Sequence, residues 1–170
     1  MLTAQPSDQQ ETSVEIKELG HLVLYVRNID RSATFYRDVL GWRQVFPDPE
    51  ETGDGPLRVP IVAFSSGRTH HELLLIEVGE DAAGLPQGRR IGLYHFGLKV
   101  GDSDDDLRAA LARIQEAGVR IAGASDHTVT HSLYIYDPDG NEIELYIDVP
   151  GKDWRNNPTL IASPIRPLVL

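Results

Sequence analysis

The chain contains no cysteine, which excludes disulfide bridges, thiolate zinc sites and cysteine nucleophiles together. It also lacks an apolar run long enough to span a bilayer, so the sequence predicts no transmembrane helix. The first residues lack the charged and apolar regions of a secretory signal, and we therefore expect a cytoplasmic protein. Positive charge is scarce: a net charge of −10 argues against nucleic-acid binding, and no basic amphipathic helix indicates a membrane surface.

Two short segments in different halves of the chain resemble each other. His21–Val26 and His95–Val100 share His, Leu and Val at the same offsets. Each alternates apolar and other residues, which predicts a β-strand that opens a repeated unit. The hydrophobic fraction of 41% suffices for a globular interior. The sequence therefore predicts an α+β fold of two repeated βαβββ modules.

Breaks in composition divide the chain. We expect residues 1–17, which are polar, to form a disordered tail. We expect residues 18–150 to form a single domain, in which a linker rich in Gly and Pro separates the modules. Module one spans 19–79, the linker 80–91 and module two 92–149, and residues 151–170 form an irregular C-terminal arm.

Capping residues and breakers predict the elements within each module. Asp30 begins a helix that Gly41 ends, and Ser103 begins a second helix that Gly118 ends. Residues 47–60 are predicted to form a loop, and 137–141 a tight turn between two strands. Besides the opening strands, apolar runs predict strands near 61–64, 71–78, 119–121, 131–136 and 142–147.

Strand alternation predicts that three metal-ligating side chains share one face. In the opening strands and in the last strand of module two, apolar residues occupy one side, so His21, His95 and Glu144 lie on the other. If the modules pair into one curved, cup-shaped sheet, this face becomes the inside of the cup. Two imidazoles and one carboxylate leave coordination positions open, as iron(II) sites that activate oxygen require. Each residue alone is as well explained as an ordinary strand or rim residue, but the repeat-related placement favours a metal site.

Three segments carry a resemblance to a known family: Gly20–Val26, Arg31–Gly41 and Tyr136–Tyr146. They resemble the vicinal oxygen chelate superfamily, which includes glyoxalase I, fosfomycin-resistance and bleomycin-resistance proteins and extradiol dioxygenases. The resemblance covers about residues 19–155, and it implies the fold of two βαβββ modules around a metal site. These motifs specify the superfamily more strongly than the reaction.

Further residues make the chain most similar to short catechol 2,3-dioxygenase-type proteins. The resemblance implies that His71 acts as acid and base, that His127 steadies bound oxygen and that Tyr134 touches the substrate. His70 or His71 could fill the first of these roles. Two positions depart from the family pattern: His131 stands where a Glu is expected, and Val149 where an Arg often precedes the proline.

The function implied by the resemblance is extradiol cleavage of a small aromatic diol by O2 in aromatic degradation, with Fe(II), or alternatively Mn(II), as cofactor, in a homodimer. A glyoxalase-like isomerase or a fosfomycin-type thiol transferase stays open, although Glu72 is expected on the wrong side of its strand to supply a fourth ligand. A metal-free binding protein is the third alternative. Whether the cup closes within one chain or across two is also open.

Overall fold

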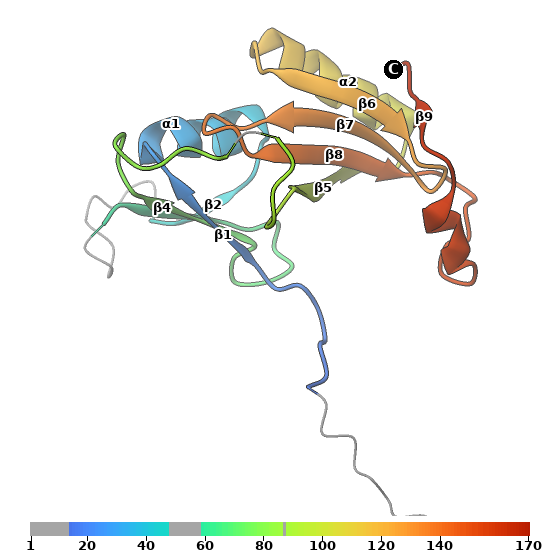
Figure 1. Cartoon of the computed structure of the whole chain (residues 1–170), viewed down its shortest axis with the longest axis horizontal. Helices are drawn as coiled ribbons and strands as arrows, with labels where there is room; N and C mark the ends of the chain where they lie inside the picture. Colours follow the sequence, from blue (N-terminus) through green and yellow to red (C-terminus); the bar gives the residue numbers. More distant parts are fainter. Residues whose placement is uncertain (1–13, 48–58, 87) are drawn as a thin grey trace, which may run out of the picture.

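The computed structural model describes residues 14–47, 59–86 and 88–170, and within these ranges the strands form two separate sheets (Figure 1). The first sheet has the order β1-β4-β3-β2, with β1 at Leu22–Val26, β2 at Gln44–Phe46, β3 at Ile61–Phe64 and β4 at Leu73–Glu77. The second has the order β5-β8-β7-β6-β9, with β5 at His95–Gly101, β6 at Ile121–Asp126, β7 at Thr130–Tyr136, β8 at Glu142–Asp148 and β9 at Arg166–Pro167.

Each sheet pairs its opening strand in parallel with the last strand of the same module, β1 with β4 and β5 with β8. The predicted repeat of βαβββ modules is confirmed. The single curved sheet is not formed within the described part of the chain, because no strand of one sheet pairs with a strand of the other. β1 and β5 are therefore edge strands, each with one unpaired side.

The helix of module one begins earlier than predicted. Asn28, not Asp30, is the N-cap of α1 (Ile29–Thr34), because its side chain accepts a hydrogen bond from Arg31 N at 2.8 Å. A π-helical turn, η1 (Phe35–Val39), extends α1, and Gly41 follows with a φ of 72° that favours glycine, as predicted.

The helix of module two, α2 (Asp104–Glu116), matches its predicted bounds. Ser103 and Asp106 form a reciprocal capping box, and Gly118 follows the helix with a φ of 65°. Leu107 and Ile114 bury the apolar side of α2 against the second sheet. No helix among the described residues is both long and apolar enough to cross a membrane.

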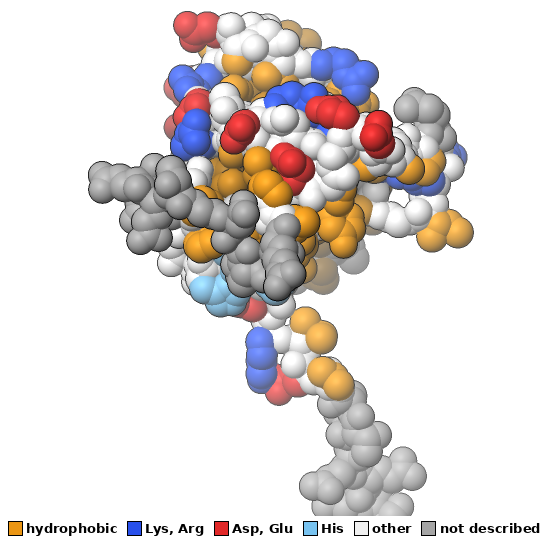
Figure 2. Space-filling model, turned by 90° about the vertical axis from the view of Figure 1, so that its left-hand side faces the viewer, with side chains coloured by type: hydrophobic (Ala, Val, Ile, Leu, Met, Phe, Trp, Pro, Cys, Tyr) orange, Lys and Arg blue, Asp and Glu red, His pale blue; other side chains and the backbone are white. Residues whose placement is uncertain are grey.

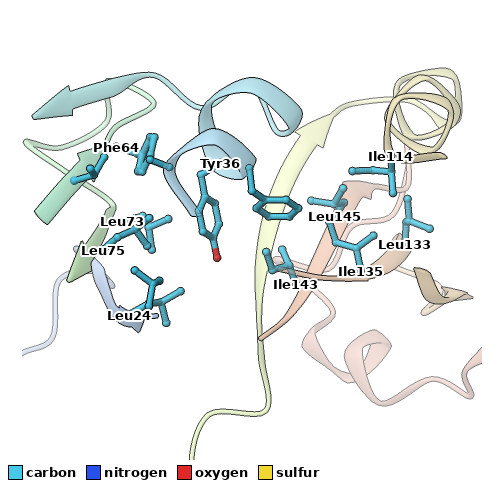
Figure 3. Close-up of a cluster of buried hydrophobic side chains, with 14 of the residues drawn as sticks. Leu24, Tyr36, Phe64, Leu73, Leu75, Ile114, Leu133, Ile135, Ile143 and Leu145 are labelled. Carbon is cyan, nitrogen blue, oxygen red and sulfur yellow. The ribbon is translucent and has the colours of Figure 1, made fainter. Parts of the chain in front are cut away.

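One buried cluster joins the two halves, and Figure 3 shows Tyr36 between side chains of both sheets. The Tyr36 side chain is fully buried, and its hydroxyl donates to Asp137 Oδ2 at 2.9 Å. Asp139, in the same turn between β7 and β8, accepts from Arg31 Nη2 at 3.0 Å. The predicted tight turn at 137–141 is therefore also the contact that fixes module two against α1.

Several predicted element bounds were wrong. β2 was not predicted, and β6 is continuous where a short strand and a loop were expected. β4 begins only at Leu73, two residues after His71. The C-terminal arm contains a 3-10 helix, η2 (Pro158–Ala162), as well as β9. Most of the predicted tail and of the 47–60 loop lies outside the described residues.

Candidate metal centre

Three strands of the second sheet place polar side chains on the face opposite α2, here called the open face. Ile143, Leu145 and Ile147 of β8 are buried on the α2 side, so Glu144 lies on the open face, as predicted. Tyr134 of β7 pairs directly with Glu144, while His95 is two residues along β5 from the residue that pairs with it. The sheet register therefore gathers a histidine, a carboxylate and a phenol.

His95 and Glu144 have the spacing of two ligands of one ion. His95 Nε2 lies 3.4 Å from Glu144 Oε2. Two donor atoms that each lie about 2.1 Å from an ion, at a right angle, are about 3 Å apart. The pair therefore fits adjacent coordination positions of a divalent metal, with a neutral imidazole and a carboxylate as donors.

The second ring nitrogen of His95 supports the same interpretation. His95 Nδ1 is buried without a hydrogen-bond partner, although Glu142 Oε1 lies 3.4 Å away. A metal-binding histidine usually donates its other N–H to a carboxylate, which fixes the ring. Glu142 is positioned for that contact after a small rotation. Sequence reasoning missed Glu142, although it has the same strand parity as Glu144.

Tyr134 links Glu144 to His127. The Tyr134 hydroxyl donates to Glu144 Oε1 at 3.2 Å, and His127 Nε2 lies 2.7 Å from the same hydroxyl oxygen. A phenol has one proton, so with that proton on Glu144 the His127 Nε2–H must donate to Tyr134. Burial, together with the negative charge of Glu144, raises the pKa of Tyr134 well above its usual value, so the hydroxyl stays protonated.

The first sheet carries a separate cluster of histidines. His21 precedes β1, and its ring centroid lies 4.7 Å from that of His71 and 6.1 Å from that of His70. His70 Nδ1 and His71 Nδ1 are 2.6 Å apart. Burial, and then the charges of His70 and His21, lower the pKa of His71. Figure 2 shows histidine side chains gathered at the surface near the point where the N-terminal segment leaves the module.

The structure does not bring the three predicted ligands into one group. His21, His95 and Glu144 all line one groove of about 1530 Å³ between the modules. Within the described ranges, however, no three His, Asp or Glu side chains are close enough together to hold a metal ion. His95 meets Glu144, and His21 meets His71, because the opening strands belong to different sheets.

Glu72 is on the side that we had excluded. Glu72, in the bend before β4, lines the same groove as His21, His95 and Glu144. The prediction was wrong because the strand begins two residues after His71. The Glu72 carboxylate is nevertheless engaged: although burial opposes it, hydrogen bonds from Ser66 and Arg68 hold the pKa of Glu72 below its usual value.

His131 lies away from the candidate centre. It pairs with Ile147, on the α2 side of the sheet. Its Nδ1 lies 2.6 Å from Asp104 Oδ1, so it links β7 to the beginning of α2. Tyr94, which sequence reasoning missed, lies beside the centre with its ring centroid 4.6 Å from that of His95.

Two βαβββ modules with a histidine–carboxylate pair on an open sheet face define the vicinal oxygen chelate class of fold. Residues 18–145 match the model of the Glyoxalase/Bleomycin resistance protein/Dioxygenase superfamily. The chain belongs to that superfamily.

The similar proteins include enzymes named for different reactions. A catechol-2,3-dioxygenase of Bacillus subtilis is 36% identical over 146 residues, which are 84% of this chain and 46% of that protein. A lactoylglutathione lyase of Neisseria meningitidis is 28% identical over 138 residues, which are 79% of this chain and 94% of that protein. The chain thus spans about half the length of the Bacillus dioxygenase and nearly all of the lyase.

Solved structures show the same fold at lower identity. A glyoxylase/bleomycin resistance protein/dioxygenase domain from Frankia matches with a TM-score of 0.61 at 21% identity, covering 79% of this chain and 99% of that one. The fosfomycin resistance protein FosX of Mesorhizobium loti matches with a TM-score of 0.57 at 20% identity, covering 80% and 95%. These matches support the fold and do not distinguish between reactions.

Proposed function

We propose that this protein is an extradiol ring-cleaving dioxygenase, which adds O2 to a catechol-type diol at a single metal ion. The connected cluster of His95, Glu144, Tyr134 and His127 on the open face carries the proposal. The similarity to the catechol-2,3-dioxygenase of Bacillus subtilis supports it. The match covers 46% of that relative, so the activity of this chain is a proposal that the experiment below tests.

The proposed metal ligands are His21, His95 and Glu144. Fe(II) is the first choice and Mn(II) the alternative, since imidazole and carboxylate donors accept both. When bound, the ion would lower the pKa of the diol hydroxyls and provide a route for electrons between diol and O2. The 3.4 Å spacing between His95 Nε2 and Glu144 Oε2 supports this pair most directly.

His71 is the proposed acid and base. Its lowered pKa keeps the imidazole neutral at neutral pH, so that it can accept a proton from a diol hydroxyl and return it later. Its ring lies beside that of His21, which places the proton acceptor next to one proposed ligand. His70, in contact with His71 through Nδ1, is the better solvated of the two.

Tyr134 and His127 are the proposed hydrogen-bonding residues. Tyr134 donates to Glu144 and so holds the carboxylate in one orientation. His127 supplies an N–H to the Tyr134 hydroxyl. Both protons are engaged in this arrangement, so either Tyr134 must leave Glu144 or His127 must leave Tyr134 before one of them can stabilise negative charge developing on oxygen.

The proposal includes a homodimer in which a second copy completes the site. His21 immediately precedes β1 and His95 begins β5, and both strands have an unpaired edge. In a two-fold dimer, β1 of one copy can pair in parallel with β5 of the other, and this direction would bring His21 of one beside His95 of the other, since both lie at the starts of their strands. Val23 and Tyr25, exposed on β1 at 43% and 71%, would become covered.

A lactoylglutathione lyase-like isomerase is the second candidate. The lyase of Neisseria meningitidis is covered over 94% of its length, whereas the dioxygenase is covered over 46%. The engagement of Glu72 by Ser66 and Arg68 argues against a fourth carboxylate ligand from this strand. We therefore keep the dioxygenase as the main proposal.

Anaerobic purification with metal analysis, followed by catechol and air, tests the proposal. Stoichiometric iron or manganese and a yellow ring-fission product would support it. Bound metal without a coloured product, over a series of substituted catechols, would overturn it and favour the isomerase, which is then assayed directly. A protein that fails to retain Fe(II) or Mn(II) after loading would leave only the binding-protein alternative.

A further inference from the structure

The C-terminal arm, residues 151–170, is fixed to the second sheet. β9 pairs with the end of β6, where Ser125 faces Pro167 and Asp126 faces Arg166. Leu168 and Leu170 pack against the buried cluster. In Figure 1 the arm, drawn in red, folds back at the end of the sheet where β6 and β8 end. The arm follows the segment that matches the superfamily, 18–145, so the family match does not describe it.

A small cavity lies between this arm and the open face. Its volume is about 230 Å³. The arm contributes Trp154 and Ile161, and the sheet contributes the opposite wall, formed by Val129, Thr130, Glu144, Tyr146 and Asp148. The guanidinium group of Arg155 stacks on the Trp154 ring, with its central carbon 4.3 Å from the ring centroid. The arm therefore forms one wall of a cavity whose other wall carries a proposed metal ligand.

The cavity extends outward from the proposed centre along β8. Glu144, Tyr146 and Asp148 alternate on one side of this strand, with the intervening residues buried. Four residues of an extended strand span about 13 Å. A group bound in the cavity would thus begin beside Glu144 and point away from it, toward the arm.

The size and charge of the walls limit what the cavity can hold. The cavity is open to solvent on one side, since Ile161 is 66% exposed. Because an enclosed cavity of about 150 Å³ in another protein is enough for benzene, a volume near 230 Å³ fits one ring or a short branched alkyl group. Val129, Trp154 and Ile161 make one side apolar. The lining includes two carboxylates and no cationic side chain. Lys99 Nζ pairs with both Asp102, at 2.6 Å, and Asp148, at 3.0 Å. An anionic group therefore finds no unpaired cation in the lining.

We propose that this cavity binds the ring substituent of the substrate, and that Trp154 and Ile161 set its permitted size. The preferred diol carries a neutral, apolar substituent no larger than about one ring, and carboxylated diols are disfavoured by Asp148. This inference rests on the proposed dioxygenase function and specifies its substrate class.

Substrate profiles of two variants test the size of the cavity. In Ile161→Ala and Trp154→Ala, kcat/KM for 4-(1-naphthyl)catechol, whose substituent is larger than one ring, relative to 4-methylcatechol should rise by about tenfold, since one or two methylenes in an apolar pocket discriminate by this order. Unsubstituted catechol does not enter the cavity and should change little. Ile165→Ala, an exposed position on the same arm that does not line the cavity, is the matched control. Equal changes for all three diols, or none, would overturn the inference.

The charge of the cavity is tested with Asp148→Asn. This change removes one carboxylate and leaves Lys99 paired with Asp102 alone, so that Lys99 can also attract an anionic substituent. The ratio of kcat/KM for 3,4-dihydroxybenzoate to that for 4-methylcatechol should rise by about tenfold, the range of a gained charge-assisted contact. An unchanged ratio would show that Asp148 does not disfavour anionic diols.

A binding measurement separates this inference from the proposed reaction. Trp42→Phe leaves Trp154 as the only tryptophan, so its fluorescence reports the cavity. Under nitrogen, 4-methylcatechol should quench it saturably and 3,4-dihydroxybenzoate should not, with a weaker apparent Kd after the further change Ile161→Ala. Saturable quenching without ring opening would overturn the proposed dioxygenase reaction and support the cavity as a binding site. Ring opening without quenching would support the reaction and overturn the inference about the cavity.

Discussion

The two histidine clusters differ in what surrounds them. On the second sheet, His95 lies between two carboxylates, and Glu144 is held by a hydrogen bond from Tyr134. On the first sheet, His21 lies beside His70 and His71. These three imidazoles supply no negative charge to balance a bound cation, whereas the second cluster includes two carboxylates. The second sheet thus offers the stronger half of a metal site.

Sheet register explains the difference. The opening strands repeat each other, but their parallel neighbours do not: Gly97 pairs with Glu144, and the corresponding Val23 pairs with Leu74. An apolar side chain stands in module one at the position of the carboxylate. The two modules therefore differ in metal-binding capacity because of the residue at one position on the last strand, which is Leu74 in module one and Glu144 in module two. The first cluster can contribute to a metal site only as a partner of the second.

Removing Glu144 should have the largest effect. Glu144→Gln replaces an anionic ligand by a neutral amide, so we expect loss of stoichiometric metal and of ring opening. Glu142→Gln, on the same strand and face, is the matched control. It should keep the metal with an affinity lowered by about 10–100-fold, the usual effect of losing a carboxylate that orients a ligating histidine. Metal analysis and titration under nitrogen measure both. Equal losses in the two variants would contradict the assigned ligand.

Mixing two inactive variants tests whether His21 of one copy completes the site of another. His21→Ala and Glu144→Ala should each be inactive alone. If the site is shared across a two-fold dimer, statistical mixing after unfolding and refolding restores about a quarter of the intact sites. If each site lies within one chain, mixing restores none. Size-exclusion chromatography confirms that the mixed species are dimers. Full activity of His21→Ala alone would remove this histidine from the ligand set.

Strand alternation predicted the open face where strands were correctly bounded. Glu144 was placed correctly because the buried residues on either side of it continue a regular pattern through β8. The same reasoning failed for Glu72, because β4 begins at Leu73 and alternation does not extend into the preceding bend. A strand's first residue depends on which partner strand reaches it, which is tertiary information.

The resemblance to a family also had a physical limit. It supported His21, His95 and Glu144, which strand alternation had grouped, but it did not show whether the edges of β1 and β5 meet, because such a pairing would depend on a surface that the local sequence does not specify. Glu142 and the cavity under Trp154 were missed for a similar reason. Both follow from side chains brought together by register or by the folding back of the arm.

Substitutions of His71 and His70 should lower kcat by different amounts, although the two residues are neighbours. As the proposed proton acceptor, His71→Ala should lower kcat by about 10²–10⁴-fold, the usual range for a general base. His70→Ala is the matched control and should cost far less. Steady-state rates of ring opening at saturating diol and air measure both. Similar losses in the two variants would indicate that the pair acts as a unit or that neither removes the proton.

The pH profile sharpens this contrast. Since a neutral imidazole is needed and the pKa of His71 is lowered, kcat/KM should fall only as the pH drops below the usual histidine value of about 6.5. His70→Ala removes one of the charges that lower this pKa, so the acid limb should move upward toward 6.5. An acid limb that does not respond to His70→Ala would assign the titration to another group.

Tyr36→Phe should have the smallest effect and leave both clusters unchanged. The lost hydroxyl removes the buried hydrogen bond to Asp137, which joins the two modules, at a cost of about 1–2 kcal/mol in the free energy of unfolding. The cost is limited because the Asp137 carboxylate still accepts from Asn141 N and Nδ2, each at 2.8 Å. Tyr25→Phe, on an exposed side chain, is the control and should change stability by less than about 0.5 kcal/mol. Urea denaturation measures the two values.

Metal affinity should stay at the wild-type level in both, because His95, Glu142 and Glu144 belong to one sheet and need no contact with module one to stay together. A loss of metal in Tyr36→Phe comparable to that in Glu142→Gln would show that the joint between the modules, and not the second sheet alone, sets the geometry of the centre.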